Sequence, residues 1–418
     1  MNEQVKKTKL HYAWIVLIGC CAMTSGMGLL LNTGGQWFEP VTKELGVGSA
    51  QLALYYTLCG LGMAVAAPFV GKYLSKVNIR ILLTVFYIIC IGAVFAMSRY
   101  TAVWQWWVSG ALLGVFGCFV FMMPAAIILG NWFVKKTGLA IGIAMSFSGI
   151  AAAIANPIIA AIIPTVGWRT AYMLIAVVAA VIILPCTIFL IRFKPEDKGL
   201  LPYGVEEDAT DDASAGAAAE ATTGVPAKTA YRSVAFWIMF FACGLFAFLT
   251  GYGQVLPQYV TVIGLPTIIG LISSMTMIGN LIGTLGLGAL SDKIGGTKTG
   301  VLGLMTVMVG FLLLIFCNQL EVAMLIGGLC YGVCLALIAV IVPIVCRGAF
   351  GSRDFNSLYA TINIACNLIG AFGIVAITLI YDMGGSYVPA LWAGAGVCIV
   401  IALGIVVSTG LAKKLPRE

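Results

Sequence analysis

Neutral polar side chains stand in pairs, four residues apart, inside otherwise apolar stretches of this sequence. The pairs are Asn32 and Gln36, Gln254 and Gln258, Asn280 and Thr284, and Asn363 and Asn367. Residues four apart share one face of an α-helix, so each pair forms a short polar stripe. Amide and hydroxyl groups donate and accept hydrogen bonds without carrying charge. The stripes therefore suggest a shared cavity wall that holds a solute by hydrogen bonds.

Aromatic residues in neighbouring stretches could close such a cavity, although aromatic side chains in helices often serve packing alone. Buried amides also link helices to one another, so any single Asn or Gln here could have that role instead. The predicted binding residues are Asn32, Gln36, Tyr55, Tyr56, Phe121, Gln254, Asn280, Thr284, Tyr331, Asn363 and Asn367.

The stretches that carry these residues must lie in lipid. Hydrophobic residues make up 61% of the 418 residues, charged residues only 9%, and the mean hydropathy is +1.05. A soluble domain carries roughly a quarter charged residues, and about twenty apolar residues cross a bilayer. We predict an all-α polytopic membrane protein with twelve transmembrane helices in two six-helix bundles. The spans are 13–35, 51–70, 81–97, 103–129, 139–166, 171–191, 234–256, 268–290, 300–317, 322–345, 358–381 and 387–411.

The basic residues support both the number of spans and their orientation. Lys and Arg stay on the cytoplasmic side of a membrane protein. With both termini inside, all of the 23 Lys and Arg residues except Lys43, Arg99 and Arg169 fall inside. An odd number of spans would destroy this bias. We predict a bacterial cytoplasmic membrane location from the compact loops.

One hydrophilic segment divides the chain near its middle. Residues 192–232 hold several acidic residues followed by an Ala- and Thr-rich stretch. Such a composition cannot bury enough apolar surface to fold alone. We predict an N-terminal bundle at 1–191, a cytoplasmic linker at 192–232 and a C-terminal bundle at 233–418.

Small residues four apart predict where helices approach closely. The glycine pairs are Gly110 and Gly114, Gly138 and Gly142, and Gly328 and Gly332. We expect these helices to pack backbone to backbone and to slide during any movement of the bundles.

Two short runs, one in each half, share a pattern in which a glycine is followed four positions later by Ser or Asp and then by a lysine. The first begins at Gly71 and reads GKYLSKVNIR, and the second begins at Gly288 and reads GALSDKIGGTK. The second run resembles the G-x-x-x-D-K-x-G signature of the major facilitator superfamily, whereas the first has Ser75 where that family usually has Asp. The resemblance implies a carrier with a substrate site near the bilayer midplane, between the two halves.

Two further runs resemble one branch of that superfamily. NWFVKKTGLAIG begins at Asn131, and Gly167, Trp168 and Arg169 follow the fifth span. Both are similar to the branch that contains monocarboxylate carriers and oxalate/formate exchangers. The topology resembles the superfamily over almost the whole chain, but the branch is indicated only by these short runs.

The resemblance also implies a conformational latch. In the family the loop aspartate caps a neighbouring helix and pairs with basic residues, which holds the cytoplasmic side shut. By resemblance Asp292 has this role here, with Lys293, Arg347 and Arg353 as candidate partners. An acid at a helix N-terminus beside a few cations gives a weak, breakable contact. Alternatively, these charges only hydrate the membrane surface.

The absence of cations in the spans constrains the cargo. Carboxylate carriers of this branch place an arginine eight residues before the loop aspartate, where this chain has Thr284. The exchangers add a lysine seven residues before a glycine, where this chain has Asn363. No Asp, Glu, Lys, Arg or His lies in the core of any span, and Glu39 and Asp382 lie near outer helix ends. A dicarboxylate would have no counter-charge, which is very costly in an apolar site.

We expect a secondary or facilitative transporter, an antiporter or uniporter, for a small organic solute, with a monocarboxylate-type metabolite as the first candidate. It would work by rocker-switch alternating access. One alternative is an exporter of neutral or amphiphilic drug-like compounds, and another is a membrane receptor or scaffold without transport. A chain without a nucleotide-binding G-x-x-x-x-G-K-[ST] loop or a catalytic constellation is not expected to be an enzyme. We expect a small-molecule substrate and the lipid bilayer as partners, no cofactor, metal or nucleic acid, and a monomer.

Overall fold

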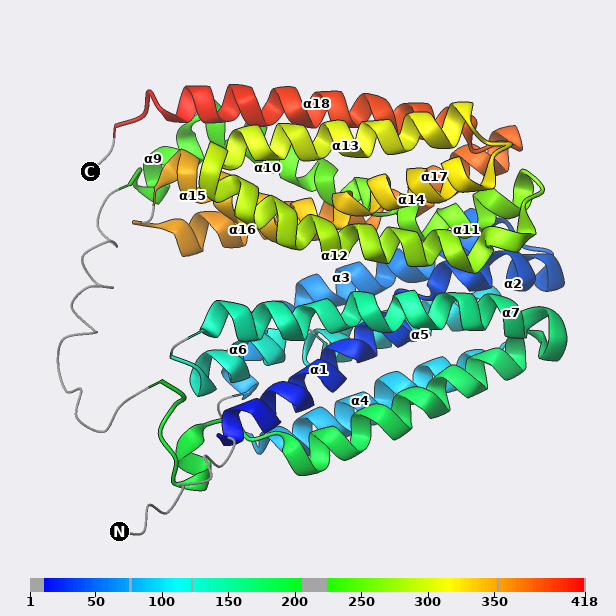
Figure 1. The fold of residues 1–418 in the computed structure, drawn as a ribbon, viewed down its shortest axis with the longest axis horizontal. Helices are drawn as coiled ribbons and strands as arrows, with labels where there is room; N and C mark the ends of the chain where they lie inside the picture. Colours follow the sequence, from blue (N-terminus) through cyan, green and yellow to red (C-terminus); the bar gives the residue numbers. More distant parts are fainter. Residues whose placement is uncertain are drawn as a thin grey trace, which may run out of the picture.

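Helices make up almost all of the chain in the computed structural model, which describes residues 11–74, 77–121, 123–134, 136–204, 224–351 and 353–416 (Figure 1). Eleven helical stretches within these ranges are long and apolar enough to cross a membrane. One of them, Thr137–Leu190, has 54 residues, more than twice the length that a bilayer needs. Its backbone leaves the helical conformation at Gly167, with φ 81° and ψ 156°, and Figure 1 shows α7 turning back on itself. The described residues therefore make twelve crossings, as predicted.

The crossings fall into two halves. The N-terminal half contains α1 (Tyr12–Leu30), the 3₁₀ turn η1 (Gly34–Trp37), α2 (Phe38–Leu45), α3 (Ser49–Leu74), α4 (Ile79–Met97), α5 (Val103–Cys118), α6 (Met123–Trp132), α7 (Thr137–Pro185) and the π-helical turn η2 (Cys186–Leu190). The C-terminal half contains α10 (Val234–Leu249), α11 (Tyr252–Val262), η4 (Pro266–Ile268), α12 (Ile269–Ile294), α13 (Gly296–Phe316), α14 (Glu321–Ala336), η5 (Leu337–Ile341), α15 (Val342–Phe350), α16 (Phe355–Ala371), α17 (Gly373–Gly384) and α18 (Val388–Ala412). Between them lie η3 (Pro195–Lys198) and α9 (Ala227–Arg232), and residues 205–223 of the predicted linker are outside the described ranges.

Local sequence explains several helix boundaries. The Asn78 side chain accepts a hydrogen bond from the Arg80 amide at 3.1 Å and begins α4. Ser233 does the same for α10 through the Phe236 amide at 3.2 Å. Both residues belong to the types that best pair the free N–H groups of a first helical turn. Between α12 and α13 the chain turns at Gly295, whose φ of 85° suits a residue without Cβ.

Several crossings are broken rather than continuous, and the first and the seventh meet at the centre of the molecule. The first changes from α1 to η1 and α2 after Leu30, and the seventh changes from α10 to α11 after Leu249. The second break is held by Tyr331, whose hydroxyl accepts from the Gly253 amide at 2.8 Å and lies 2.8 Å from the Leu249 carbonyl oxygen. A break in lipid is tolerated only where such partners satisfy the freed backbone groups.

Close helix packing occurs at two of the three predicted glycine pairs. A Cβ atom on Gly110 or Gly114 would lie 2.2 Å from a backbone oxygen of α3, and one on Gly332 would lie 2.1 Å from a backbone oxygen of α12. For Gly138 and Gly142 the prediction of close packing is wrong in this conformation, because a Cβ atom there would meet no described atom within 4 Å. These two glycines lie at the end of α7 where the two halves separate.

We name the two ends of the bundle from the helices that reach them. At the terminal end, α1 begins and α18 ends (left in Figure 1). At the distal end lie α2, the turn of α7 and the junction of α11 with α12 (right in Figure 1). The surface where the two halves meet is called the seam below.

Candidate functional site

A hydrogen-bonded roof closes the seam where the first and seventh crossings are broken. The side-chain carbonyl of Gln254, on α11, accepts from the Gly35 amide at 3.0 Å and lies 3.1 Å from the Tyr56 hydroxyl. The same hydroxyl is 3.0 Å from the Leu31 carbonyl oxygen. A Cβ atom on Gly35 would lie 2.5 Å from the Gln254 backbone oxygen, so glycine is needed for this approach. Gln254 thus joins the C-terminal half to the first and second crossings of the N-terminal half.

Gln36 forms a second link across the seam. Its side-chain amide nitrogen donates to Asn156 of α7 at 3.2 Å and to Ser273 of α12 at 3.0 Å. Gln36 is 5% exposed, and its side-chain oxygen has no hydrogen-bond partner among the described residues. In this conformation Gln36 therefore links helices, which was the alternative to solute binding that the sequence left open.

Further polar contacts cross the seam at its distal end. The Gln258 amide donates to the Ser49 hydroxyl at 2.6 Å and accepts from the Tyr387 hydroxyl at 2.7 Å. The Asp382 carboxylate accepts from the backbone amides of Ser49 and Ala50 at 3.3 and 2.9 Å. A carboxylate at the positive N-terminal end of α3 is a favourable charge–dipole contact. The distal end is therefore closed by groups from both halves.

Toward the terminal end the seam opens. On α7 one face carries Gly138, Gly142, Gly149, Ala153 and Asn156, at helical spacing. Gly138 and Gly142 are exposed, whereas Gly149 and Asn156 are buried. The buried part contacts α12, because the Ala153 carbonyl accepts a hydrogen bond from the other half at 2.6 Å. One helix face thus passes from solvent-accessible to tightly packed along its length, so α7 and α12 diverge toward the terminal end.

Four predicted asparagines lie half-buried below the roof, on its terminal-end side. Asn32 follows α1, and Asn280 of α12 approaches Gly149 of α7. Asn363 and Asn367 on α16 donate only to backbone oxygens of their own helix, at 3.3 and 3.0 Å. The side chains of Asn32 and Asn280 make no hydrogen bond with any described residue. All four side chains keep hydrogen-bonding capacity that the described residues do not use.

The other predicted binding residues have partners within their own half. Phe121 is buried and meets the Tyr87 ring edge-on, with ring centroids 6.2 Å apart. Thr284 donates to the Asn280 backbone oxygen at 2.8 Å. Tyr55 is buried, and its ring centroid lies 4.2 Å from that of Tyr56, which belongs to the roof. The Tyr331 hydroxyl holds the break between α10 and α11, so its described contacts are structural.

The proposed latch is described only in part. Lys293 and Arg347 are exposed at the terminal end, in the last turns of α12 and α15. Arg353 is also exposed and lies between α15 and α16. The Asp292 backbone lies in α12, but its side chain is outside the described residues. The latch therefore stays a prediction.

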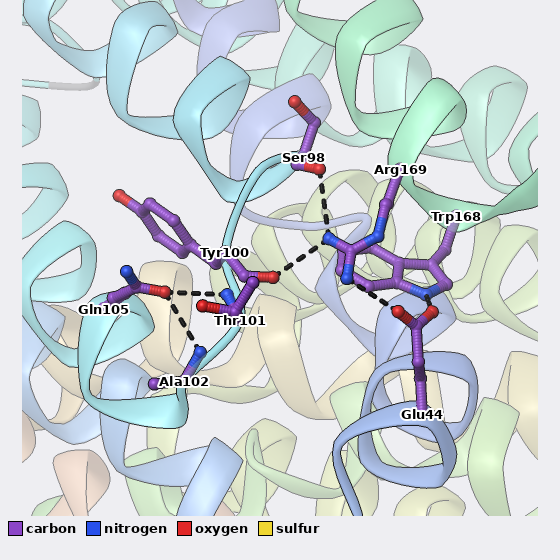
Figure 2. Close-up of polar contacts among 8 residues, drawn as sticks. All are labelled: Glu44, Ser98, Tyr100, Thr101, Ala102, Gln105, Trp168 and Arg169. Atoms are coloured by element: carbon purple, nitrogen blue, oxygen red, sulfur yellow. Dashed lines mark hydrogen bonds and ion pairs between the residues drawn. The ribbon is translucent and has the colours of Figure 1, made fainter.

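The predicted Gly-Trp-Arg run organises the distal end of the N-terminal half (Figure 2). Arg169 forms an ion pair with Glu44 at 2.6 Å and donates to the Tyr100 carbonyl oxygen at 2.9 Å, while the Trp168 indole donates to Glu44 at 2.5 Å. These hydrogen bonds, first that of Arg169 and then that of Trp168, lower the pKa of the Glu44 carboxyl. Glu44 lies in the last turn of α2, past the apolar part of the first crossing, and its side chain is 48% exposed. The cluster fixes α2 against the turn at Gly167, so it positions the wall of the seam.

Comparison with known proteins decides the family. The family model for the Major Facilitator Superfamily matches residues 13–268 and 265–417. This chain belongs to the Major Facilitator Superfamily. The broken first and seventh crossings and the polar seam are thus features of a superfamily member. The monocarboxylate or oxalate/formate branch is not decided by this match.

This superfamily member is distantly similar to several known proteins. An uncharacterised transporter of the superfamily from Bacillus subtilis (strain 168), YcxA, is 22% identical over 193 residues, which cover 45% of this chain and 47% of YcxA. The match thus spans about half the length of that relative. A mutant form of the nucleoside transporter NupG has a TM-score of 0.75 at 12% identity, covering 95% of this chain and 100% of that chain. A bacterial homologue of the human lysosomal transporter Spinster has a TM-score of 0.67 at 13% identity, with 97% of each chain covered. These similarities show the fold.

Several seam residues of this superfamily member were not predicted from its sequence. Ser273 and Ser49 accept across the seam from Gln36 and Gln258, whereas Asn156 and Tyr387 bond the same two amides from within their own halves. Asp382 contacts the start of α3 from the other half. Serine and tyrosine are frequent in membrane helices, so their types alone do not mark them. Asn156 was the signal that could have been used, because it is an amide inside the fifth span.

Proposed function

We propose that this chain is a secondary or facilitative transporter that carries a small organic solute by alternating access between its two halves. The observation that supports this proposal is the asymmetry of the seam. Its distal end is closed by hydrogen bonds between the halves, and its terminal end diverges along α7 and α12. A rocking movement that breaks the first set of contacts and joins the second would expose the asparagines to the opposite side.

The sidedness follows from the charge distribution. Nearly all Lys and Arg residues lie in the segments that reach the terminal end, and such segments stay cytoplasmic. On this assignment the terminal end faces the cytoplasm of a bacterial cell, with both chain ends inside, and this conformation faces inward.

The substrate class follows from the chemistry below the roof. Asn32, Asn280, Asn363 and Asn367 offer amide donors and acceptors without charge. Several amide donors can bind one carboxylate, but no charged residue lies in the core of any span to balance a second. We therefore favour a monocarboxylate or an uncharged polar metabolite over a dicarboxylate. The coupling would be exchange or facilitated diffusion.

Uptake into liposomes tests the proposal. Purified protein would be reconstituted and assayed with labelled monocarboxylates, dicarboxylates, uncharged polar metabolites and lipophilic cations, with and without a pH gradient. We expect saturable uptake of a monocarboxylate or neutral solute. High-affinity oxalate uptake would contradict the substrate argument, lipophilic cation transport would favour the exporter, and no uptake of any solute by folded protein would favour a receptor or scaffold.

A matched pair of variants tests the site itself. Asn363→Leu removes an amide whose described donor bond goes only to its own helix, so we expect uptake to fall at least tenfold with unchanged membrane abundance. Thr306→Val is the control, because Thr306 is exposed and also donates only to its own helix, at 3.1 Å. Equal uptake by both variants would assign Asn363 to helix packing.

A further inference from the structure

A separate cavity lies in the seam on the distal side of the roof. It has a volume of about 100 Å³ and is lined by groups from both halves, among them Gln36, Glu39, Ala160 and Thr261. One water takes up about 30 Å³ in the liquid, so the space suits a small ion or a molecule of a few heavy atoms. Neither Glu39 nor this cavity has a part in the solute site below the roof.

Two acceptors in this cavity lack partners among the described residues. The Glu39 carboxylate is half-buried and has no ion-pair or hydrogen-bond partner among the described residues. The Gln36 side-chain oxygen, one helical turn earlier, is buried and also has no such partner. Most donors nearby are used: the Gln258 amide donates one of its two N–H groups to Ser49, and the Thr261 hydroxyl donates to the Pro257 carbonyl oxygen at 3.0 Å.

Prolines make the wall richer in acceptors. Pro40 and Pro164 both line the cavity, and proline has no N–H to pair with the carbonyl four residues earlier. Those carbonyls belong to Gln36 and Ala160, which line the same cavity. Backbone oxygens, an amide oxygen and one carboxylate are the ligand set of a hard cation or of a protonated amine.

The number of charged side chains in the cavity indicates the charge of the ion that it would bind. Glu39 is the one ionisable side chain among the residues that line the cavity. Calcium sites usually gather several carboxylates, and magnesium sites hold one or two together with several waters; the described residues hold no group of three His, Cys, Asp or Glu side chains that could bind a metal. A single carboxylate with neutral oxygens balances a single positive charge.

We propose that this distal cavity is a binding site for a small monovalent cation, either an alkali-metal ion or a small ammonium. Glu39 supplies the charge, and Gln36 supplies an acceptor that otherwise stays unpaired. Because both halves line the cavity only when the distal end is closed, the cation stabilises this conformation over one that opens distally. That last consequence rests on the proposed transport cycle, whereas cation binding itself does not.

Thermal unfolding of the purified full-length protein tests the site. The melting temperature would be measured at constant ionic strength while N-methylglucamine chloride is replaced by sodium, potassium, ammonium or methylammonium chloride. We expect a saturable rise with at least one small cation, because a ligand that binds only the folded state stabilises it. The series separates the two sources: a response limited to sodium or potassium indicates an alkali-metal site, and one limited to the amines indicates an ammonium site. Equal melting temperatures in all salts would overturn the proposal.

Two variants and a control locate the response. Glu39→Gln should weaken the apparent affinity at least tenfold, and Ala160→Leu should abolish the response by filling the cavity with Glu39 kept. Glu321→Gln should retain it, because Glu321 is also a distal carboxylate but accepts from Thr267 at 2.6 Å outside the cavity. A response that survives both Glu39→Gln and Ala160→Leu would refute the site. Uptake measured in parallel separates the proposals, since intact uptake without a cation response rejects only this one.

Discussion

Replacing Gln254 by leucine removes the acceptor at the centre of the roof. Leucine keeps a similar size but leaves the Gly35 N–H without a partner, and the Tyr56 hydroxyl keeps only the Leu31 carbonyl. A buried donor without a partner costs about 1–3 kcal/mol. Taking about 2 kcal/mol, the distally closed state should lose about 30-fold in population relative to a distally open one, since 1.4 kcal/mol is tenfold.

Hydrogen–deuterium exchange in the absence of substrate measures this shift. Peptides that cover residues 34–50 and 254–262 should exchange about 30-fold faster in Gln254→Leu than in the wild type if their amides exchange through distal opening. The terminal end of α7 should change in the other direction, because opening one end closes the other in a rocking movement.

Gln105→Leu is the matched control for this experiment. Gln105 also loses two hydrogen bonds, from the Thr101 and Ala102 amides at 2.8 and 3.1 Å, and it lies at the distal end (Figure 2). These bonds stay within the N-terminal half, so the variant should affect only the start of α5. Unchanged exchange around Gly35 in Gln254→Leu, or the same acceleration there in Gln105→Leu, would refute the role of the roof.

Three further predictions follow from the described contacts. Tyr331→Phe leaves the Gly253 N–H with only its 3.2 Å bond to the Thr250 carbonyl oxygen, and it removes the donor to the Leu249 carbonyl oxygen. It should lower the stability to unfolding by about 0.5–1.5 kcal/mol, which denaturant unfolding would measure; unchanged stability would contradict its structural role. Gly142→Val should fold normally, because a Cβ atom there meets open space, but it should lose uptake if the terminal end must close. Gly114→Val should instead lower the melting temperature, because its Cβ atom would lie 2.2 Å from the Cys59 backbone oxygen. Normal uptake by Gly142→Val would contradict closure of the terminal end. The pKa of Glu44 is lowered in the folded protein from its ordinary value of 4.5, so its contribution to stability is present above that value and is lost as the pH falls through the lower folded-state pKa. The melting temperature of the wild type should therefore fall more on acidification below about pH 4.5 than that of Glu44→Gln, and parallel curves would contradict this reading.

The number of crossings and the family could be predicted because both depend on local features. The length of each hydrophobic stretch predicts one span at a time. The long helix α7 forms two of the predicted spans, because its backbone turns at Gly167, which belongs to the Gly-Trp-Arg run identified in the sequence. Stripes of amides likewise predicted that Gln36 and Gln254 would lie in the interior. Whether each one would bind a solute or link helices could not be predicted, because an amide has the same chemistry in both roles.

The sequence alone determined that this is a membrane protein with twelve spans whose cores lack charged residues, because each of these properties depends on local composition. Only the tertiary structure decided which amides are already used. Gln36 and Gln254 bond partners in the other half, 237 and 219 residues away in sequence, and these contacts depend on the relative position of the two halves. The same packing decided that Gly138 and Gly142 face open space while Gly149 is buried, and it assembled the acceptor-lined cavity at Glu39 from both halves. Contacts between halves depend on the relative position of two bundles, and no local pattern encodes that position.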